Sequence, residues 1–202
     1  VDIKKFSPPS GHEKTNLRTM NGYDVRDFII LYIAEFTFRK NHELILNRVE
    51  QLNDKIENLK IIFAGDGPLL NKYKNKIKRS NLSSVIDFSG YRNDVDVLCK
   101  MADISLSPSK QEGLPIGIVE GFASGLPVVC SKIRGHTDVI KDEHNGFLFE
   151  LNNPQHMVDS IVRLYNDPGL RSKMAQNNIQ DAKKYSGDIA VSKMAEIYTK
   201  WM

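Results

Sequence analysis

Short, almost continuous apolar runs alternate along this chain with longer segments whose apolar residues recur at helical spacing. The run Phe28–Ile33 is apolar throughout, and Leu59–Ala64 is interrupted only by Lys60. Strands of this kind are covered on both faces, which is typical of parallel sheets with helices on either side. The alternation therefore predicts an α/β fold, a doubly wound parallel sheet of about six strands.

The predicted elements divide the chain into three parts. Residues 1–24 are polar and predict a linker or arm with one short helix, residues 25–187 the sheet domain, and residues 188–202 a last helix. The predicted strands are 28–33, 59–64, 85–88, 104–107, 127–130 and 146–149. The predicted helices are one capped by Asn41, followed by 69–78, 95–101, 115–123, 154–165 and 168–184.

Composition bounds the class of protein. The chain has 202 residues, of which 41% are hydrophobic and 26% charged, as in ordinary soluble domains. A net charge of +3 is too small to indicate a nucleic-acid partner. One basic cluster predicts a solvated helix face, with a patch for anionic lipid or a partner domain as the alternative: Lys72, Lys74, Lys76, Lys78 and Arg79.

Cysteine usage and hydropathy bear on the compartment. Cys99 and Cys130 have no metal-ligand or disulfide spacing, so we interpret both as free buried thiols of a reducing compartment. No apolar run approaches the roughly 18 residues that a membrane span needs. We therefore expect a cytoplasmic protein. An alternative for the full-length chain is a location at the inner face of the membrane.

Ligands of a doubly wound sheet bind beyond the carboxyl ends of its strands. One loop there holds Glu112 and leads into a helix that carries Glu120. Glu120 is the only charged residue between Leu114 and Cys130, and burying a carboxylate is costly unless something hydrogen-bonds to it. The two glutamates are thus a candidate ligand site. The plain alternative is a loop carboxylate and a core residue paired with a lysine.

The helix after Glu112 also predicts a phosphate site. Pro115 suits the first position of a helix, and Gly113 and Gly117 let the backbone approach a ligand closely. Amides at a helix start, with the helix dipole, favour a phosphate or diphosphate. Glu112 would then accept from ligand hydroxyls at the mouth, and Glu120, about two turns along, would receive a ribose diol.

The stretch Ser107–Val129 resembles the glutamate-x7-glutamate signature of retaining glycosyltransferases of family 4. Other landmarks follow in that family's order. Gly65–Leu69 resembles its Gly-x-Gly-Pro-Leu turn, Phe88–Tyr91 its Phe-x-Gly turn, and Asn145–Leu148 its Asn-Gly strand. The likeness covers residues 27–185 and implies the GT-B fold, two Rossmann-like domains facing across a cleft. This chain would be the donor-binding half.

The resemblance implies a role for each matching position. Glu112 would be a catalytic residue that binds hydroxyls of the donor sugar, and Glu120 would bind the ribose. Lys40 would be the second catalytic residue, the lysine that binds the diphosphate. The other substrate-binding positions would face the sugar and diphosphate (Gly113, Leu114, Pro115, Ile116 and Gly117) or the base edge (Tyr91 and Arg92).

The loop that carries Lys40 departs from the family at one position. Glu35 replaces the usual arginine, which puts one phosphate contact in doubt, and Arg39 could supply some of the missing charge. Lys40 also has a physical argument, because a fixed cation stabilises the β-phosphate of a leaving nucleotide by on the order of 3 kcal/mol. The plain alternative is a surface lysine before a helix.

Other signals are weaker. Asp94 and Asp96 match the Asp-x-Asp metal motif of another glycosyltransferase fold, but they open a predicted helix, so capping and dipole compensation explain them better. His136 could approach the sugar, although a loop or capping role is the simpler interpretation. No residues have convincing metal-ligand spacing, so we expect no metal and no cofactor besides the donor substrate.

Together these features predict the donor domain of a hexosyl-type glycosyltransferase. It would bind a nucleoside diphosphate sugar, most simply a UDP-sugar, for retaining transfer to a polysaccharide, lipopolysaccharide or glycolipid. Val1–Pro8 resembles the family's interdomain segment and 188–202 its crossover helix, so the N-terminal acceptor domain would be missing and the fragment inactive. Two rivals remain: a non-catalytic nucleotide-binding module, and a GT-B nucleotide-sugar 2-epimerase, whose acidic and histidine residues this sequence does not place.

Overall fold

A parallel sheet forms the centre of the computed structural model, which describes residues 1–78 and 80–199. The strand order is β3-β2-β1-β4-β5-β6, and each neighbouring pair is parallel. This confirms the predicted doubly wound sheet. The strands are β1 (Phe28–Ile33), β2 (Leu59–Ala64), β3 (Ile86–Gly90), β4 (Ile104–Ser107), β5 (Val128–Ser131) and β6 (Gly146–Phe149).

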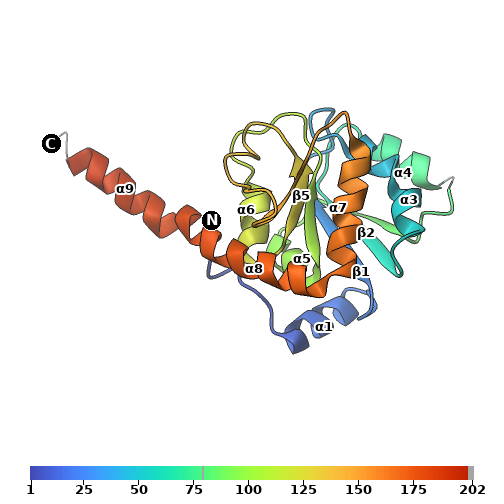
Figure 1. Ribbon diagram of the computed structural model, residues 1–202, viewed down its shortest axis with the longest axis horizontal. Coiled ribbons are helices and arrows are strands. Elements are labelled where there is room, and N and C mark those ends of the chain that lie inside the picture. Colours follow the sequence, from blue (N-terminus) through green and yellow to red (C-terminus); the bar gives the residue numbers. More distant parts are fainter. Residues whose placement is uncertain (79, 200–202) are drawn as a thin grey trace.

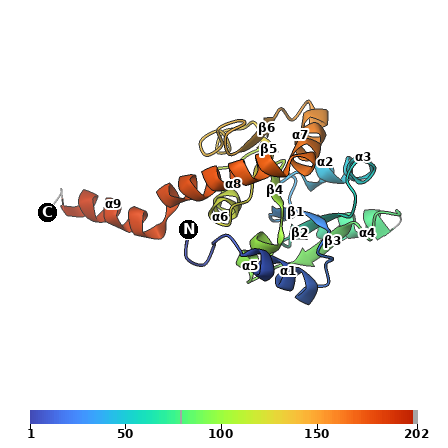
Figure 2. The same cartoon turned by 60° about the horizontal axis from the view of Figure 1, so that its bottom comes forward.

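Helices cover both faces of the sheet (Figures 1 and 2). Along β1 the side chains alternate, so Ile30 and Tyr32 belong to one hydrophobic cluster while Ile29 and Leu31 belong to the other. Each such buried side chain contributes about 1.5–3 kcal/mol. The helices are α1 (Gly11–Met20), α2 (His42–Leu46), α3 (Val49–Asn53), α4 (Leu70–Lys78), α5 (Val95–Met101), α6 (Ile116–Ala123), α7 (Pro154–Asn166), α8 (Pro168–Ala182), the 3-10 turn η1 (Lys183–Tyr185) and α9 (Gly187–Thr199).

Two predicted helix caps are wrong. Asn41 has a left-handed backbone (φ 55°) and makes no cap bond; its amide instead donates to the Pro108 carbonyl at 3.1 Å. The helix predicted after it is two short helices, α2 and α3. Asp94 does not cap α5 either, because its carboxylate accepts from Arg92 Nε at 2.6 Å. In both cases a contact outside the helix has taken the capping side chain.

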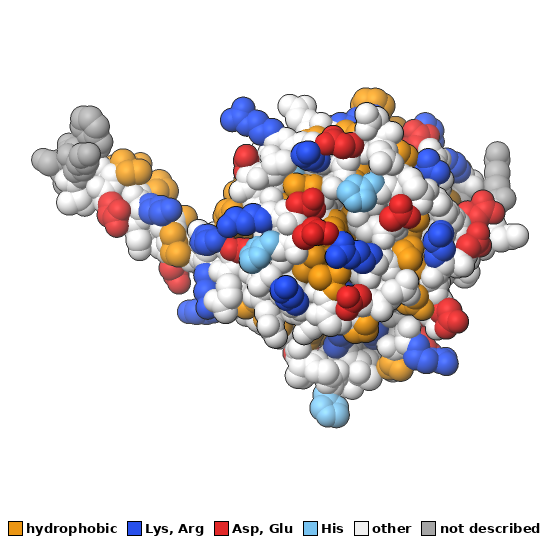
Figure 3. All heavy atoms as spheres, in the orientation of Figure 1, with side chains coloured by type: hydrophobic (Ala, Val, Ile, Leu, Met, Phe, Trp, Pro, Cys, Tyr) orange, Lys and Arg blue, Asp and Glu red, His pale blue; other side chains and the backbone are white. Residues whose placement is uncertain are grey.

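Surface charge agrees with a solvated basic helix. In α4, Tyr73 and Ile77 are buried while Lys72 and Lys76 are exposed; Arg79 lies outside the described residues. On the face drawn in Figure 3, acidic and basic side chains are interspersed. Within residues 1–78 and 80–199 no helix has both the length and the apolar character to cross a membrane.

The two ends of the chain differ in how they contact the sheet domain. In α1, buried Arg18 donates to Asp103 Oδ2 at 2.7 Å and so ties the predicted arm to the sheet. Helix α9 projects away from the body (Figure 1), and its Met194 and Tyr198 are exposed. The predicted division at residues 24 and 187 stays a prediction, and residues 200–202 of the predicted last helix lie outside the described part.

Candidate functional site

Three adjoining hollows lie where the sequence predicted the site, beyond the carboxyl ends of the strands. The central hollow lies at the point where β1 and β4 are neighbours and the strand order reverses. Ile33 lines both this hollow and one towards β2 and β3. Leu114 and Ile116 line both it and a third hollow beside α9. The three hollows thus adjoin one another through shared lining residues, and together they are called the trough.

The central hollow brings the two candidate catalytic residues together. Lys40 follows β1 and Glu112 follows β4, and Lys40 Nζ lies 2.6 Å from Glu112 Oε1. Their side chains are only 17% and 8% exposed. Lys40 is therefore not the plain surface lysine of the alternative interpretation. The pair places a cation and an acceptor side by side at the switch point.

The groups around Glu112 favour the ionised form of its carboxylate. Burial opposes its ionisation, but hydrogen bonds from Lys40 and Ser109 outweigh burial, so the pKa of Glu112 is lowered. A carboxylate held in this state accepts hydrogen bonds and donates none. It can receive hydroxyl groups of a ligand through lone pairs that Lys40 does not occupy.

Hydrogen bonds that the sequence did not predict join the Lys40 loop to the Glu112 loop. The Tyr32 hydroxyl donates to the Lys40 carbonyl at 2.6 Å and lies 3.1 Å from Ser109 Oγ. The Lys110 amide donates to the Arg39 carbonyl at 2.8 Å. A signal was present in the sequence, since Ser105, Ser107 and Ser109 alternate on one side of an apolar strand and the loop after it.

The start of α6 presents backbone to the same hollow. Pro115 lies at the N-cap of α6, which begins at Ile116, so it is one residue before the first helical position that was predicted for it. The Ile116 amide donates to the Leu114 carbonyl at 2.9 Å in a local turn. The Gly117 amide has no backbone acceptor within the described residues, so it is available to a ligand at the positive end of the helix dipole. Gly113 and Leu114 are exposed at the mouth.

Glu120 lies apart from Glu112, in the third hollow with Tyr185 and α9. Burial raises the pKa of Glu120, and Asp96 adds to the rise, while Lys5 and the N-terminal amine oppose it. Within residues 1–78 and 80–199 its carboxylate has no hydrogen bond or ion pair, and Lys5 pairs with Asp96 at 3.3 Å instead. The alternative of a core glutamate paired with a lysine is therefore wrong for the described residues.

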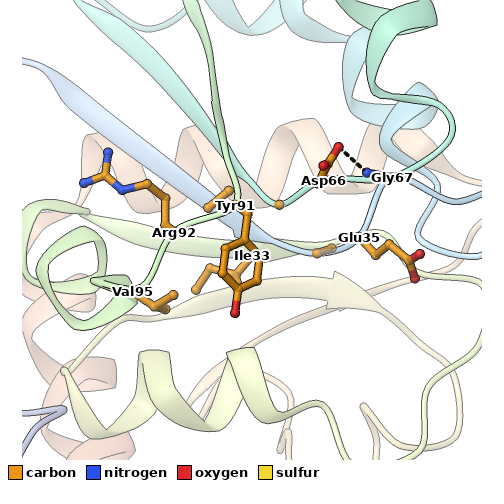
Figure 4. A pocket seen from close by; sticks show the side chains of 10 residues that line it. Ile33, Glu35, Asp66, Gly67, Tyr91, Arg92 and Val95 are labelled. Atoms are coloured by element: carbon orange, nitrogen blue, oxygen red, sulfur yellow. Dashed lines mark hydrogen bonds between the residues drawn. The ribbon is translucent and has the colours of Figure 1, made fainter.

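The hollow beside β2 and β3 holds the candidate base-binding residues (Figure 4). Its volume of about 510 Å³ is in the range of small-molecule pockets. The Tyr91 ring is 78% exposed and stands in the middle of the lining. Arg92 also lines this hollow, and its guanidinium is paired with Asp94 at 2.5 Å. Glu35 lies at the other end of the pocket.

Gly65 explains why this hollow has its shape. Its φ is +151°, and a Cβ placed there would lie 2.1 Å from the Ala34 carbonyl oxygen. No residue with a side chain fits so close to the backbone that follows β1. The predicted Gly-x-Gly-Pro-Leu turn thus packs directly against the loop that leads to Lys40.

The structure also locates the weaker candidates. His136 is fully buried and contacts Ser107 and Ser131, so it neither caps a helix nor reaches the trough. Asp94 and Asp96 are each paired with a basic side chain, Arg92 and Lys5. Over the described ranges 1–78 and 80–199, no three His, Cys, Asp or Glu side chains group as metal ligands.

Comparison with known proteins assigns the family. The model of the family described as "Glycosyl transferases group 1" matches residues 13–181. The chain belongs to this family. Among relatives in the family, "Putative glycosyltransferase EpsD" of Bacillus subtilis (strain 168) is 32% identical over 202 residues, which are 100% of this chain and 53% of EpsD.

A second group 1 relative is the "UDP-Gal:alpha-D-GlcNAc-diphosphoundecaprenol alpha-1,3-galactosyltransferase" of Escherichia coli. It is 29% identical over 184 residues, 89% of this chain and 47% of that protein. The chain thus spans about half the length of these relatives.

Solved structures agree on the fold. Staphylococcus aureus TarM, crystallised with Fondaparinux, alpha-GlcNAc-glycerol and UDP, matches with a TM-score of 0.79 and 25% identity. The match covers 86% of this chain and 36% of TarM. The structural neighbours are GT-B glycosyltransferases, so this group 1 chain is one Rossmann-like half of a GT-B fold.

Proposed function

We propose that this chain is the donor-binding domain of a retaining family 4 glycosyltransferase that uses a UDP-sugar. The observation that carries the proposal is the Lys40–Glu112 pair, held at 2.6 Å beside the Gly117 amide at the switch point. One cation, one unoccupied amide and one charged acceptor are the groups that a sugar diphosphate requires. Groups of this kind at a helix start favour phosphate.

Each part of the trough then receives one part of the donor. The base lies beside Tyr91 and Arg92, with the ribose hydroxyls on Glu120. The diphosphate takes Lys40 and the Gly117 amide, and the sugar hydroxyls take Glu112. The base and the diphosphate occupy adjoining hollows, because Ile33 lines both the first and the second.

In this proposal Lys40 acts when the bond between the anomeric carbon and the β-phosphate oxygen breaks. The leaving diphosphate gains negative charge, and a cation already held in place stabilises it without reorganisation. Glu112 holds the sugar while positive charge develops on its ring, as in an oxocarbenium-like transition state. The acceptor hydroxyl then attacks the same face of the anomeric carbon and gives its proton to the departing β-phosphate oxygen.

The relatives support the choice of donor and acceptor. TarM was crystallised with UDP, and the Escherichia coli relative is named for a UDP-galactose donor and a diphosphoundecaprenol acceptor. We therefore propose a UDP-hexose donor and a glycan or lipid-linked acceptor. The acceptor site belongs to a second GT-B domain outside this chain, and the full-length enzyme would meet such an acceptor at the cytoplasmic face of the membrane. No metal takes part in donor binding.

Calorimetric titration tests this proposal. The chain is titrated with UDP, GDP, UDP-glucose, UDP-galactose and UDP-N-acetylglucosamine. We expect UDP and at least one UDP-sugar to bind, and Lys40→Ala to weaken both. Lys55→Ala is the matched control, because Lys55 is an exposed cation that lines none of the three hollows. Binding of no nucleotide by the folded chain would favour the rival non-catalytic interaction module.

A further inference from the structure

A buried polar cluster lies directly behind Glu112, and the proposed reaction leaves it without a role. Its members are all buried, and His136, Ser109 and Ser131 are fully inaccessible. Burying this much polar surface is costly unless its hydrogen bonds are satisfied. The other members of the cluster are Tyr32 and Ser107.

The direction of each hydrogen bond follows from the acceptors. His136 Nδ1 lies 2.7 Å from the Ser131 carbonyl oxygen, which only accepts, so Nδ1 carries the proton. Burial lowers the pKa of His136 and keeps the ring neutral, although the bond to Ser131 opposes this. Nε2 is then an acceptor, and Ser107 Oγ, 3.2 Å away, donates to it.

These assignments leave the Ser109 hydroxyl as the one whose proton His136 and the Lys40 carbonyl do not engage. Tyr32 donates to the Lys40 carbonyl at 2.6 Å, and Ser107 donates to His136. Ser109 lies between the two, 3.1 Å from Tyr32 Oη and 3.3 Å from Ser107 Oγ, and its hydroxyl helps to lower the pKa of Glu112. The ring of His136 thus orients the Ser107 hydroxyl, which in turn neighbours Ser109 behind Glu112.

The backbone beside His136 supports Glu112 as well. Gly135 has φ +89°, and a Cβ there would lie 2.3 Å from the Gly113 carbonyl oxygen and 2.8 Å from that of Glu112. The loop after β5 therefore backs directly onto the Glu112 loop. His136 anchors this loop to Ser107, at the end of β4, and to Ser131, at the end of β5.

We propose that His136 is a positioning residue for the sugar-binding carboxylate Glu112, acting through Ser107 and Ser109 and through the Gly135 backbone. The inference rests on the proposed function in one respect, that Glu112 receives hydroxyls of the donor sugar. His136 itself touches no ligand. Loss of its ring nitrogens therefore weakens recognition of the sugar and spares recognition of the base and ribose.

The test compares two buried histidines. His136→Phe removes both nitrogens, and His42→Phe is the matched control, because His42 is equally buried but its ring nitrogens have no partner in the described structure. We expect His136→Phe to weaken UDP-glucose about tenfold more than UDP, as loss of a positioned charged hydrogen bond does. His42→Phe should leave the ratio of the two dissociation constants unchanged. A folded His136→Phe protein with the wild-type ratio would overturn the proposal.

Two further measurements keep the proposal testable. If His136→Phe does not fold, His136→Asn is used instead. Its amide can donate to the Ser131 carbonyl, but it is too short to reach Ser107 as the imidazole Nε2 does, and the same ratio of dissociation constants is measured. If wild type binds neither ligand, the proposed function fails, and carbon-13 NMR titration of Glu112 decides the inference separately. We then expect His136→Asn to raise the pKa of Glu112. An unchanged titration would contradict positioning.

Discussion

The two glutamates of the site lie in surroundings of opposite character. Glu112 is paired with Lys40 at 2.6 Å, and its pKa is lowered because that bond and Ser109 outweigh burial. Glu120 has no partner in the described structure, and burial raises its pKa. Both are half-buried or more, and α6 carries one while the loop before it carries the other.

This difference shows that only the Glu112 part of the site is stabilised before a ligand binds. At Glu112 the charge is already stabilised, so a ligand gains from geometry held in advance. At Glu120 the carboxylate is desolvated without compensation, so a pair of ligand hydroxyls would relieve a cost that the unliganded protein carries. We therefore expect Glu112 to select among donors and Glu120 to supply affinity for the nucleotide common to them.

The largest expected effect is that of Lys40→Ala. It leaves the carboxylate of Glu112 buried without its cation, which destabilises the fold by about 3 kcal/mol and removes the diphosphate contact. Denaturant unfolding measures the stability and calorimetry the affinity for UDP.

A double variant separates these two consequences. Lys40→Met with Glu112→Gln removes both charges and should recover most of the stability, because no unpaired charge remains, but not UDP binding. Recovery of UDP affinity along with stability would contradict a role for Lys40 at the diphosphate.

A smaller effect is expected from pH. The pKa of Glu120 lies above its ordinary 4.5 and that of Glu112 below it. As the pH falls, Glu120 is protonated first, which relieves its burial cost but weakens the acceptor for ribose. The stability that ionised Glu112 contributes persists above its ordinary pKa and is lost only as the pH falls through the lowered value.

Affinity for UDP measured from about pH 7 to about pH 4 checks this order. Wild type should lose more affinity over the window than Glu120→Gln, which has no carboxyl to protonate. The titration of UDP itself is common to both proteins. Parallel profiles would contradict the raised pKa of Glu120 as the cause.

The smallest expected effect is that of divalent cations. Lys40 and the Gly117 amide carry the phosphate recognition in our proposal, so magnesium should change UDP affinity by less than about tenfold, or about 1.4 kcal/mol. Calorimetry with magnesium and then with excess chelator measures the change. A drop of tenfold or more on chelation would show that this arrangement is incomplete.

Most of the fold could be predicted from local pattern. The apolar runs at 28–33, 59–64, 104–107 and 146–149 are strands with the predicted bounds. These runs are short, apolar and flanked by turn residues, which is the local pattern that predicts strands buried on both faces. That the loops after these strands hold the candidate site followed from the same alternation.

The cap at Asn41 and the cluster around His136 could not be predicted in this way. The Asn41 amide bonds to Pro108, 67 residues away, and the Tyr32 hydroxyl meets Ser109 across 77 residues. Such contacts exist only after β1 and β4 become neighbours. The loop pattern indicated the two glutamates and the family resemblance added Lys40, but neither indicated the residues that hold them.

The role of each glutamate is tested most directly by four titrations, of UDP and UDP-glucose into Glu112→Gln and Glu120→Gln. Glu50→Gln, an exposed carboxyl on α3, is the control. The account predicts that Glu120→Gln weakens UDP by about 1.5–3 kcal/mol, the worth of a hydrogen bond to a charged group. It predicts that Glu112→Gln leaves UDP unchanged and weakens only UDP-glucose. Equal effects of the two substitutions on the two ligands would contradict it.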